Sequence, residues 1–230
     1  MEGLISEEHM QQLDKKIAAI GLPEEYTETM RKEAAAAQKG YFLLFHRTEI
    51  DALPVEVALG FQERKEGGKD FQPDLMSVRL ESHPQNLVNR NVFYLPTGSD
   101  VSIREAVNLM QGRAIYRASE IPGDDNHWMR LDSGKEFHGI RSPYIVKGHL
   151  DVAEWLKRSP LNKKVSSEEK AAIVKGLEQG DRYALDREQT GTIYLEASPE
   201  KDRVDMKNEN GKLIRRSLAA DRVRTTGRQR

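Results

Sequence analysis

The sequence contains no cysteine. Disulfide bonds, thiolate metal sites and cysteine nucleophiles are therefore excluded. A chain without cysteine also fits a reducing cytoplasm, which is the compartment that we expect. No apolar run approaches the roughly 20 residues that a helix needs to cross a bilayer, so we predict no membrane partner. The acidic start, with Glu2, Glu7 and Glu8, lacks the basic region and apolar core of a signal peptide.

Net charge is nearly absent as well. The chain has 36 Lys and Arg against 37 Asp and Glu, a formal charge of -1, so no global field attracts or repels nucleic acid. The charges are unevenly distributed, because seven bases and the single acid Asp221 lie within residues 212–230. A basic segment of this kind is able to bind polyanions, although basic tails are more often only solvated.

Hydrophobic residues are sparse, at 37% of the chain, but 230 residues suffice for one large domain or two small ones. Near the start, Met10, Leu13, Ile17 and Ile20 recur at helical spacing until Gly21 ends the pattern. We predict a helix there over 6–20 and a second, alanine-rich helix over 24–38. Together they form a helical hairpin.

From residue 41 onward, apolar residues alternate or run together, as they do in strands. We predict strands over 55–62, 75–81 and 91–95, and a buried strand or short buried helical piece over 41–46. A helix capped by Ser99 or Asp100 then ends at Gly112. Further along we predict helices over 149–158 and 166–180, and a hairpin that pairs 192–197 with 203–207.

These elements interleave irregularly, which favours an α+β fold: an N-terminal helical hairpin, then mixed, mostly antiparallel sheet pieces with short helices. Four segments follow from the pattern. They are a helical hairpin (1–40), a mainly β segment (41–98), an α+β domain (99–214) and a basic, flexible tail (215–230). Large apolar residues at helical or alternating spacing are expected to form the core, namely Leu109, Met110, Ile115, Trp128, Trp155 and Ile173.

Several short motifs in the second half occur in a fixed order. They are AVNLMQGRA over 106–114, Trp128 followed by Leu131-Asp132, Phe137-His138, the predicted helix over 166–180, and EASP over 196–199. In this order they resemble a family of domains of unknown function from proteins of conjugative and other mobile elements of Bacteroidetes-type bacteria. The resemblance covers about residues 102–214. It implies an association with mobile-element proteins, some of which process DNA, and it supplies no catalytic residues.

Two groups contain residue types that bind metals. The run DDNH over 124–127 follows Ile-Pro-Gly, which is typical of an exposed turn, and a calcium loop needs more oxygen ligands at regular spacing. His127, His138 and His149 are eleven residues apart, whereas zinc histidines more often include a close pair. Glycine-rich phosphate loops and the G-x-S-x-G nucleophile motif are absent. We therefore predict neither a metal site nor a cofactor.

Clustered basic residues are the strongest candidates for a binding site, because Lys and Arg neutralise phosphates and make affinity salt-dependent. Trp155 and Tyr183 would add stacking surfaces if they were exposed. The alternative is that Trp155 is core and the arginines belong to a solvated tail. The candidate nucleic-acid-binding residues are Lys163, Lys164, Arg215, Arg216, Arg222, Arg224, Arg228 and Arg230.

We predict that the protein is a non-enzymatic binding or accessory module of a mobile genetic element that contacts a protein or nucleic-acid partner. One alternative is an enzyme of unrecognised type within the 102–214 domain. Its polar residues would be His138, Arg113, Asp132 and Glu196, gathered in a concave pocket. The other alternative is a structural protein that self-associates through the acidic helical hairpin.

Overall fold

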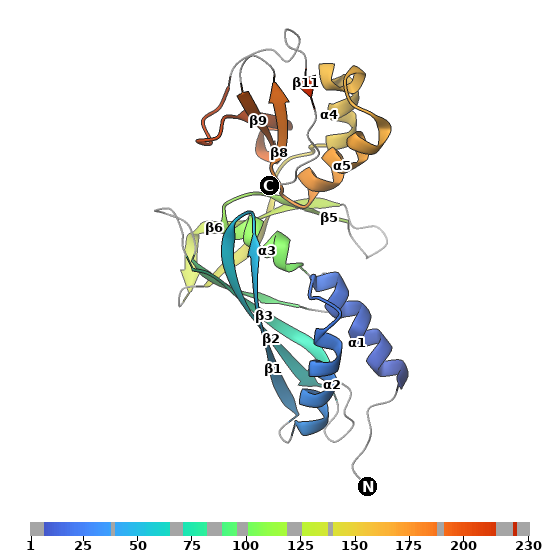
Figure 1. The fold of residues 1–230 in the computed structure, drawn as a ribbon. Helices are drawn as coiled ribbons and strands as arrows, with labels where there is room; N and C mark the ends of the chain where they lie inside the picture. The colour runs from blue at the N-terminus through green and yellow to red at the C-terminus, as the bar shows by residue number, and fades with distance from the viewer. Residues whose placement is uncertain are drawn as a thin grey trace. The chain divides into compact units, whose positions relative to one another are not determined.

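The computed structural model describes residues 7–37, 40–64, 71–81, 89–95, 101–118, 126–137, 140–187, 191–214 and 223–224. The chain forms two compact units (Figure 1). Unit 1 comprises Met1–Met110 and Ser133–Ser142, and unit 2 comprises Gln111–Asp132 and Pro143–Arg230. The predicted segments 1–40 and 41–98 thus share one unit. None of the helices in the described ranges combines the length and apolar character needed to span a bilayer.

Unit 1 begins with the predicted helical hairpin, α1 (Glu7–Ile20) and α2 (Tyr26–Ala36). Acidic residues in the first turn of α1 suit the positive end of its dipole. Gly21 ends α1 with a φ of 95°, and its N–H donates to the carbonyl of Ile17 at 3.1 Å. The apolar stripe of α1 is buried, as are Met30 and Ala34 of α2.

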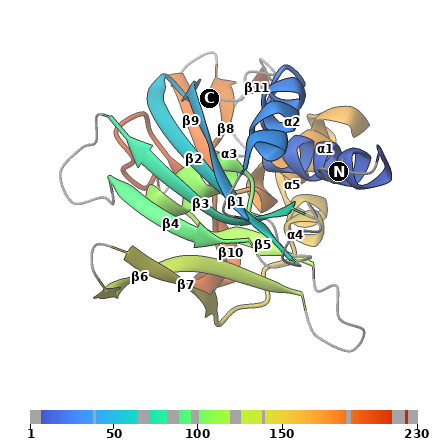
Figure 2. The ribbon, with the colours of Figure 1, turned by 90° about the horizontal axis from the view of Figure 1, so that it is seen from below.

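A four-stranded antiparallel sheet follows, in the order β1-β2-β3-β4. Its strands are β1 (Tyr41–Ile50), β2 (Leu53–Glu63), β3 (Phe71–Leu80) and β4 (Arg90–Tyr94). Asp51 and Ala52 join β1 to β2 with φ values of 52° and 61°, as a type I′ turn requires. Figure 2 shows the four strands side by side. Helix α1 contacts β3, and α2 contacts β1.

One face of this sheet supplies the core of unit 1. Phe42 stacks on Phe61 with ring centroids 4.6 Å apart and meets the edge of Phe71 at 5.1 Å. Buried side chains from all four strands continue this face, including Leu59 of β2 and Phe93 of β4. Helix α3 (Ile103–Met110) contacts β3 and β4, and seven of its eight residues are buried.

Helix α3 begins with a capping box. The hydroxyl of Ser102 accepts from the N–H of Glu105 at 3.3 Å, and the Glu105 carboxylate accepts from the N–H of Ser102 at 2.8 Å. The predicted cap at Ser99 or Asp100 is therefore wrong, because the helix starts later. Gly112 follows α3 with a φ of 76°, and the helix ends before it as predicted.

Unit 2 contains most of a three-stranded sheet in the order β5-β6-β7. Its strands are β5 (Ile115–Arg117), β6 (His127–Phe137) and β7 (Ile140–Val146). Residues 133–142, where β6 leads into β7, belong to unit 1. There the Asn91 side chain on β4 accepts from the N–H of Arg141 at 2.8 Å and donates to its carbonyl at 3.1 Å. The amide side chain thereby pairs with the backbone as a strand would.

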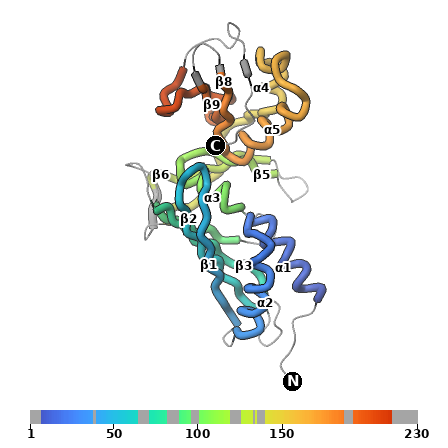
Figure 3. Tube along the Cα trace, in the orientation of Figure 1, coloured from blue at the N-terminus to red at the C-terminus, as the bar shows by residue number. Residues whose placement is uncertain are grey.

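The rest of unit 2 combines helices with a second antiparallel sheet. The helices are α4 (Val152–Arg158), the 3-10 helix η1 (Pro160–Lys163) and α5 (Ser167–Glu178). The sheet has the order β10-β9-β8-β11. Its strands are β8 (Tyr183–Arg187), β9 (Gly191–Ser198), β10 (Arg203–Lys207) and β11 (Val223–Arg224). The 3-10 helix η2 (Pro199–Lys201) joins β9 to β10. Figure 3 shows α5 beside β8 and β9. The predicted hairpin of 192–197 with 203–207 is confirmed.

The core of unit 2 surrounds Trp128, which is buried and donates its indole N–H to the carbonyl of Leu150 at 3.0 Å. Of the predicted core residues, five are buried, whereas Trp155 is only partly buried against this core. The chain is thus an α+β protein with an N-terminal helical hairpin and antiparallel sheets, as predicted.

Candidate functional site

The second face of the β1–β4 sheet, which we call the open face, differs from a solvated polar surface. Its residues alternate with the core residues along each strand, and the register aligns them in rows across the sheet. Each row takes one residue from each strand, in the order β1, β2, β3, β4. Two rows are mainly apolar: Leu43, Gly60, Leu75 and Tyr94, and next to it Phe45, Ala58, Ser77 and Val92. The third row is charged: Arg47, Glu56, Arg79 and Arg90. Apolar and aromatic side chains therefore lie beside a charged row.

The aromatic residues of the open face are unusually accessible. Phe45 is 70% exposed and Tyr94 is 72% exposed, and Tyr41 and Leu43 on β1 are exposed as well. A single exposed aromatic residue needs no explanation, but several that share one sheet face form a patch of the kind that binds partners.

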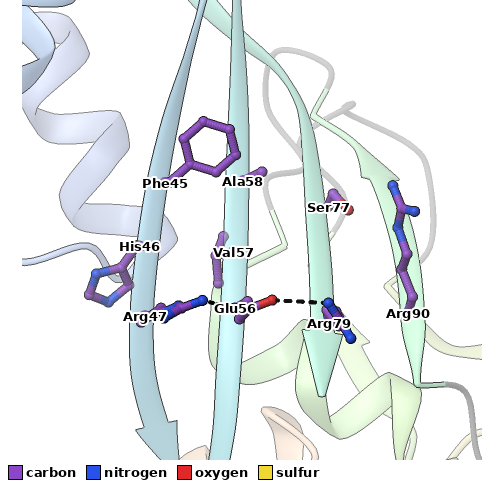
Figure 4. A pocket seen from close by; sticks show the side chains of 9 residues that line it. All are labelled: Phe45, His46, Arg47, Glu56, Val57, Ala58, Ser77, Arg79 and Arg90. Carbon is purple, nitrogen blue, oxygen red and sulfur yellow. Dashed lines mark hydrogen bonds and ion pairs between the residues drawn. The ribbon is translucent and has the colours of Figure 1, made fainter. Parts of the chain in front are cut away.

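Small residues form the floor between the edge strands. A depression of about 530 Å³ is lined by Phe45, Ala58, Ser77 and the charged row (Figure 4). At Gly60 a Cβ atom would lie 3.1 Å from Leu75 Cγ and 3.6 Å from Leu43 Cδ2. The two leucines therefore close over Gly60, and the open floor lies at Ala58 and Ser77.

Glu56 joins two arginines of the charged row. Its carboxylate accepts from Arg47 at 2.5 Å and from Arg79 at 3.4 Å, as the dashed lines in Figure 4 show. The two arginine side chains are mostly exposed, whereas that of Glu56 is 26% exposed. Arg90, on β4, makes no ion pair with any residue that the structure describes. The row therefore presents more positive than negative charge.

His46 connects strand β1 to helix α2, on the face of the sheet opposite to the open face. Its Nδ1 atom lies 2.9 Å from the Tyr26 hydroxyl, and the two rings meet edge to face at 4.8 Å. Burial lowers the pKa of His46, although the Glu25 carboxylate acts in the opposite direction. The contact between His46 and Tyr26 therefore helps to hold β1 against α2, so that the opposite side of β1 faces outward.

The predicted nucleic-acid-binding residues have different positions. Lys163 ends η1, and Lys164 follows it; both are exposed. Arg224 lies in β11, which pairs with β8. The other five, Arg215, Arg216, Arg222, Arg228 and Arg230, lie outside the described residues. Tyr183 is 4% exposed, so the exposure that a stacking surface there would need is not met.

Three of the four residues of the enzyme alternative lie in the described part of the chain. Arg113 is buried and donates to the Gly180 carbonyl at 3.4 Å and to Gln111. Glu196 is buried between Arg182, at 3.0 Å, and Lys207. Asp132 lies on β6, and His138 lies outside the described residues. These contacts of Arg113 and of Glu196 thus lead to different partners.

A second depression, of about 830 Å³, lies in unit 2 and is lined in part by His127, His149, Asp151 and Glu178. Two of the three equally spaced histidines therefore reach one surface. Burial, followed by the charge of Asp151, raises the pKa of Glu178. No group of three His, Asp or Glu side chains suited to a metal ion occurs among the described residues, and Asp124 and Asp125 lie outside them.

The open face does not follow from the sequence pattern alone. The segment 41–46 was predicted to be buried, and the structure shows that only one side of it is: Phe42 and Leu44 are core, whereas Leu43 and Phe45 are exposed. The missed signal was an alternation in which both faces of the strand are apolar, because a strand with one solvated face normally carries polar residues there.

No protein-family model matches the chain, and neither a curated protein nor a solved structure is significantly similar to it. The resemblance of residues 102–214 to the mobile-element family therefore stays a prediction. What the chain binds has to be inferred from the chemistry of its own surfaces.

Proposed function

We propose that this protein is a non-enzymatic binding module whose open face binds single-stranded nucleic acid. The observation that carries the proposal is the exposure of Phe45 and Tyr94 on one sheet face beside Arg47, Arg79 and Arg90. Aromatic rings stack on bases, and arginines neutralise phosphates, so a strand with unpaired bases satisfies both halves of the face.

A double strand fits this face less well, because its bases are stacked on one another and their faces are hidden. Stacking of a base on an aromatic side chain contributes about 1–3 kcal/mol, largely without regard to sequence. The proposed activity is therefore binding that prefers single strands and has little sequence preference. A protein partner is the competing occupant, and aromatic and arginine residues would suit it as well.

The cellular setting is also a proposal. We place the protein in the cytoplasm, as an accessory protein of a mobile genetic element, on the strength of the missing cysteines and the motif resemblance of residues 102–214. Self-association through the helical hairpin has less support, because the apolar side of α1 and α2 is already buried within unit 1.

Fluorescence anisotropy with labelled single strands and duplexes of about 12 nucleotides tests the proposal. We expect Phe45→Ala and Tyr94→Ala each to weaken single-strand binding by about fivefold to a hundredfold. Tyr144→Ala is the matched control, because Tyr144 is an exposed aromatic residue on β7. Equal losses in all three variants, or no binding to single strands even at low salt, would contradict the proposal. The latter result would favour a protein partner.

The basic tail is a second candidate surface for the same ligand, together with Lys163 and Lys164. Arginines that contact only phosphates supply salt-dependent affinity without selecting a strand type. A chain that ends at Leu213 should therefore bind more weakly but keep its preference for single strands. Unchanged affinity in this shortened chain would exclude a role for the tail.

A further inference from the structure

We infer that the charged row of the open face is a phosphate-binding row, along which a nucleic-acid backbone runs across the β-strands, and that Glu56 holds its arginines in position. This inference rests on the proposed function, since it specifies how a single strand lies on the face. The register carries it first: Arg47, Glu56, Arg79 and Arg90 are direct partners across four adjacent strands.

The row has dimensions suited to a short stretch of backbone. Adjacent strands lie about 4.8 Å apart, so the four residues span about 14 Å. A stacked strand advances by about 3.4 Å along its axis per phosphate, and the distance between neighbouring phosphates along the backbone is larger, most of all in an extended strand. The row therefore faces roughly two or three phosphates of an extended strand. A ligand that ran parallel to the β-strands would meet the row at only one point.

The apolar rows lie on one side of this line. On β1, Phe45 precedes Arg47 by two residues on the same face, which separates them by about 7 Å along the strand. On β4, Val92 follows Arg90 by two residues on the same face, and Tyr94 follows Val92 by two more. A backbone on the charged row therefore places its bases over Phe45 and the small-residue floor. The arrangement gives the ligand a defined orientation across the sheet.

Glu56 needs an explanation, because a carboxylate on a phosphate-binding surface repels the ligand. It bridges Arg47 and Arg79 and is the least exposed of the three. Free arginine side chains lose rotamer freedom when they bind, and a shared carboxylate fixes them in advance. Each guanidinium has five N–H donors, so both keep donors for phosphate. Three arginines against one glutamate leave the row positive.

The test measures the affinity for oligothymidylate as a function of salt in the full-length protein. Each phosphate contact on a single strand contributes about 0.7 to the slope of log affinity against log salt. Arg47→Gln, Arg79→Gln and Arg90→Gln should therefore each reduce the slope by about 0.7. Arg31→Gln is the control, because Arg31 is a part-exposed, ion-paired arginine on α2, and it should leave the slope unchanged.

Glu56→Gln separates positioning from simple charge, because the two predict effects of opposite sign. The substitution removes a negative charge, so a merely adjacent Glu56 would give tighter binding once it is neutralised. If Glu56 positions the arginines, the affinity falls by about fivefold despite the gain in net charge. Glu56→Asp, which keeps the charge, should lose less. Urea unfolding of each variant shows that the fold is retained.

The outcomes distinguish the inference from the proposed function. Failure of the wild-type protein to bind any single strand contradicts both. Binding that depends on Phe45 but keeps its salt slope in all three arginine variants contradicts the phosphate row and leaves the proposed function intact. Tighter binding by Glu56→Gln overturns the positioning role of Glu56.

Discussion

Gly148 occupies a position in unit 2 where no side chain fits. A Cβ atom there would lie 2.0 Å from the carbonyl oxygen of Pro199 and 2.6 Å from its carbon. The same turn is held by Asp202, whose carboxylate accepts from the N–H of His149 at 2.6 Å. The close approach therefore joins the segment before α4 to the η2 turn.

Gly148→Ala should destabilise the protein by about 1–3 kcal/mol, because backbone atoms rather than a flexible side chain must move. Thermal and urea unfolding measure the loss. Gly176→Ala in α5 is the matched control: its Cβ would lie 3.8 Å from Asp181 Cβ, an ordinary contact, and alanine favours a helix interior by roughly 0.5–1 kcal/mol. A Gly148→Ala protein as stable as the wild type would contradict the close approach.

Glu196 is a buried carboxylate whose protonation should weaken unit 2. Burial by itself raises its pKa, but the hydrogen bond and charge of Lys207, with Arg182, outweigh burial and lower the pKa below the ordinary value of 4.5. A group with a lowered folded-state pKa adds stability above its unfolded pKa and loses it as the pH falls through the folded value. Stability should therefore decline as the pH falls below about 4.5.

Glu196→Gln should lower the free energy of unfolding by about 1–3 kcal/mol at neutral pH, because Arg182 and Lys207 lose their buried anionic partner. The loss is moderated because the Arg182 side chain is 34% exposed. The substitution should also flatten the acid limb of the stability curve, measured by urea unfolding between neutral pH and the acid range. Glu154→Gln, which breaks only exposed pairs with Lys157 and Arg158, should cost less than about 0.5 kcal/mol. An acid limb that is equally steep in both variants would exclude Glu196 as its source.

At the scale of elements, helix starts were predictable where one signal dominated. Ser166 begins α5 with a capping box to Glu169, and the sequence pattern placed this start correctly. At α3 three candidates compete, and Ser102 wins because only it has a glutamate three residues later, at Glu105. The rule that decides is reciprocal hydrogen bonding rather than the presence of a capping residue.

Strand β8 was not predicted, because its sequence lacks the alternation that identifies a half-buried strand. Tyr183, Ala184 and Leu185 are all buried, since α5 packs near β8 while β9 pairs with its edge. A short, continuous apolar run is compatible with either a strand or a buried helical turn. Only the pairing with β9, which depends on residues further along the chain, decides between them.

The open face was hidden from the sequence for a related reason. Alternation shows which residues of β1–β4 share a face. Over 41–45, however, both faces of β1 are apolar, and the pattern there does not show which face the helices cover. That choice is made when α1 and α2 pack on the sheet. The candidate site is consequently a product of tertiary packing, although the register that aligns its arginines follows from local hairpins.

At the scale of the whole molecule, the division into two units does not follow the chain. Residues 133–142 belong to unit 1, although their neighbours on both sides in the sequence belong to unit 2. Segments predicted from composition are continuous stretches of the chain. They therefore cannot show that a short internal stretch belongs to the other unit. The hydrogen bonds of Asn91 with Arg141, fifty positions apart, are the local reason for it.

This division predicts that binding and the stability of unit 2 are separable. All residues of the open face lie in unit 1, whereas Gly148 lies in unit 2. The Gly148→Ala protein should therefore bind single strands within about twofold of the wild-type affinity at temperatures where it stays folded. Phe45→Ala should show the reverse, with weak binding and nearly unchanged stability, because Phe45 is mostly exposed. Anisotropy and urea unfolding on the same samples compare the two effects, and a large loss of affinity in Gly148→Ala would show that unit 2 takes part in binding.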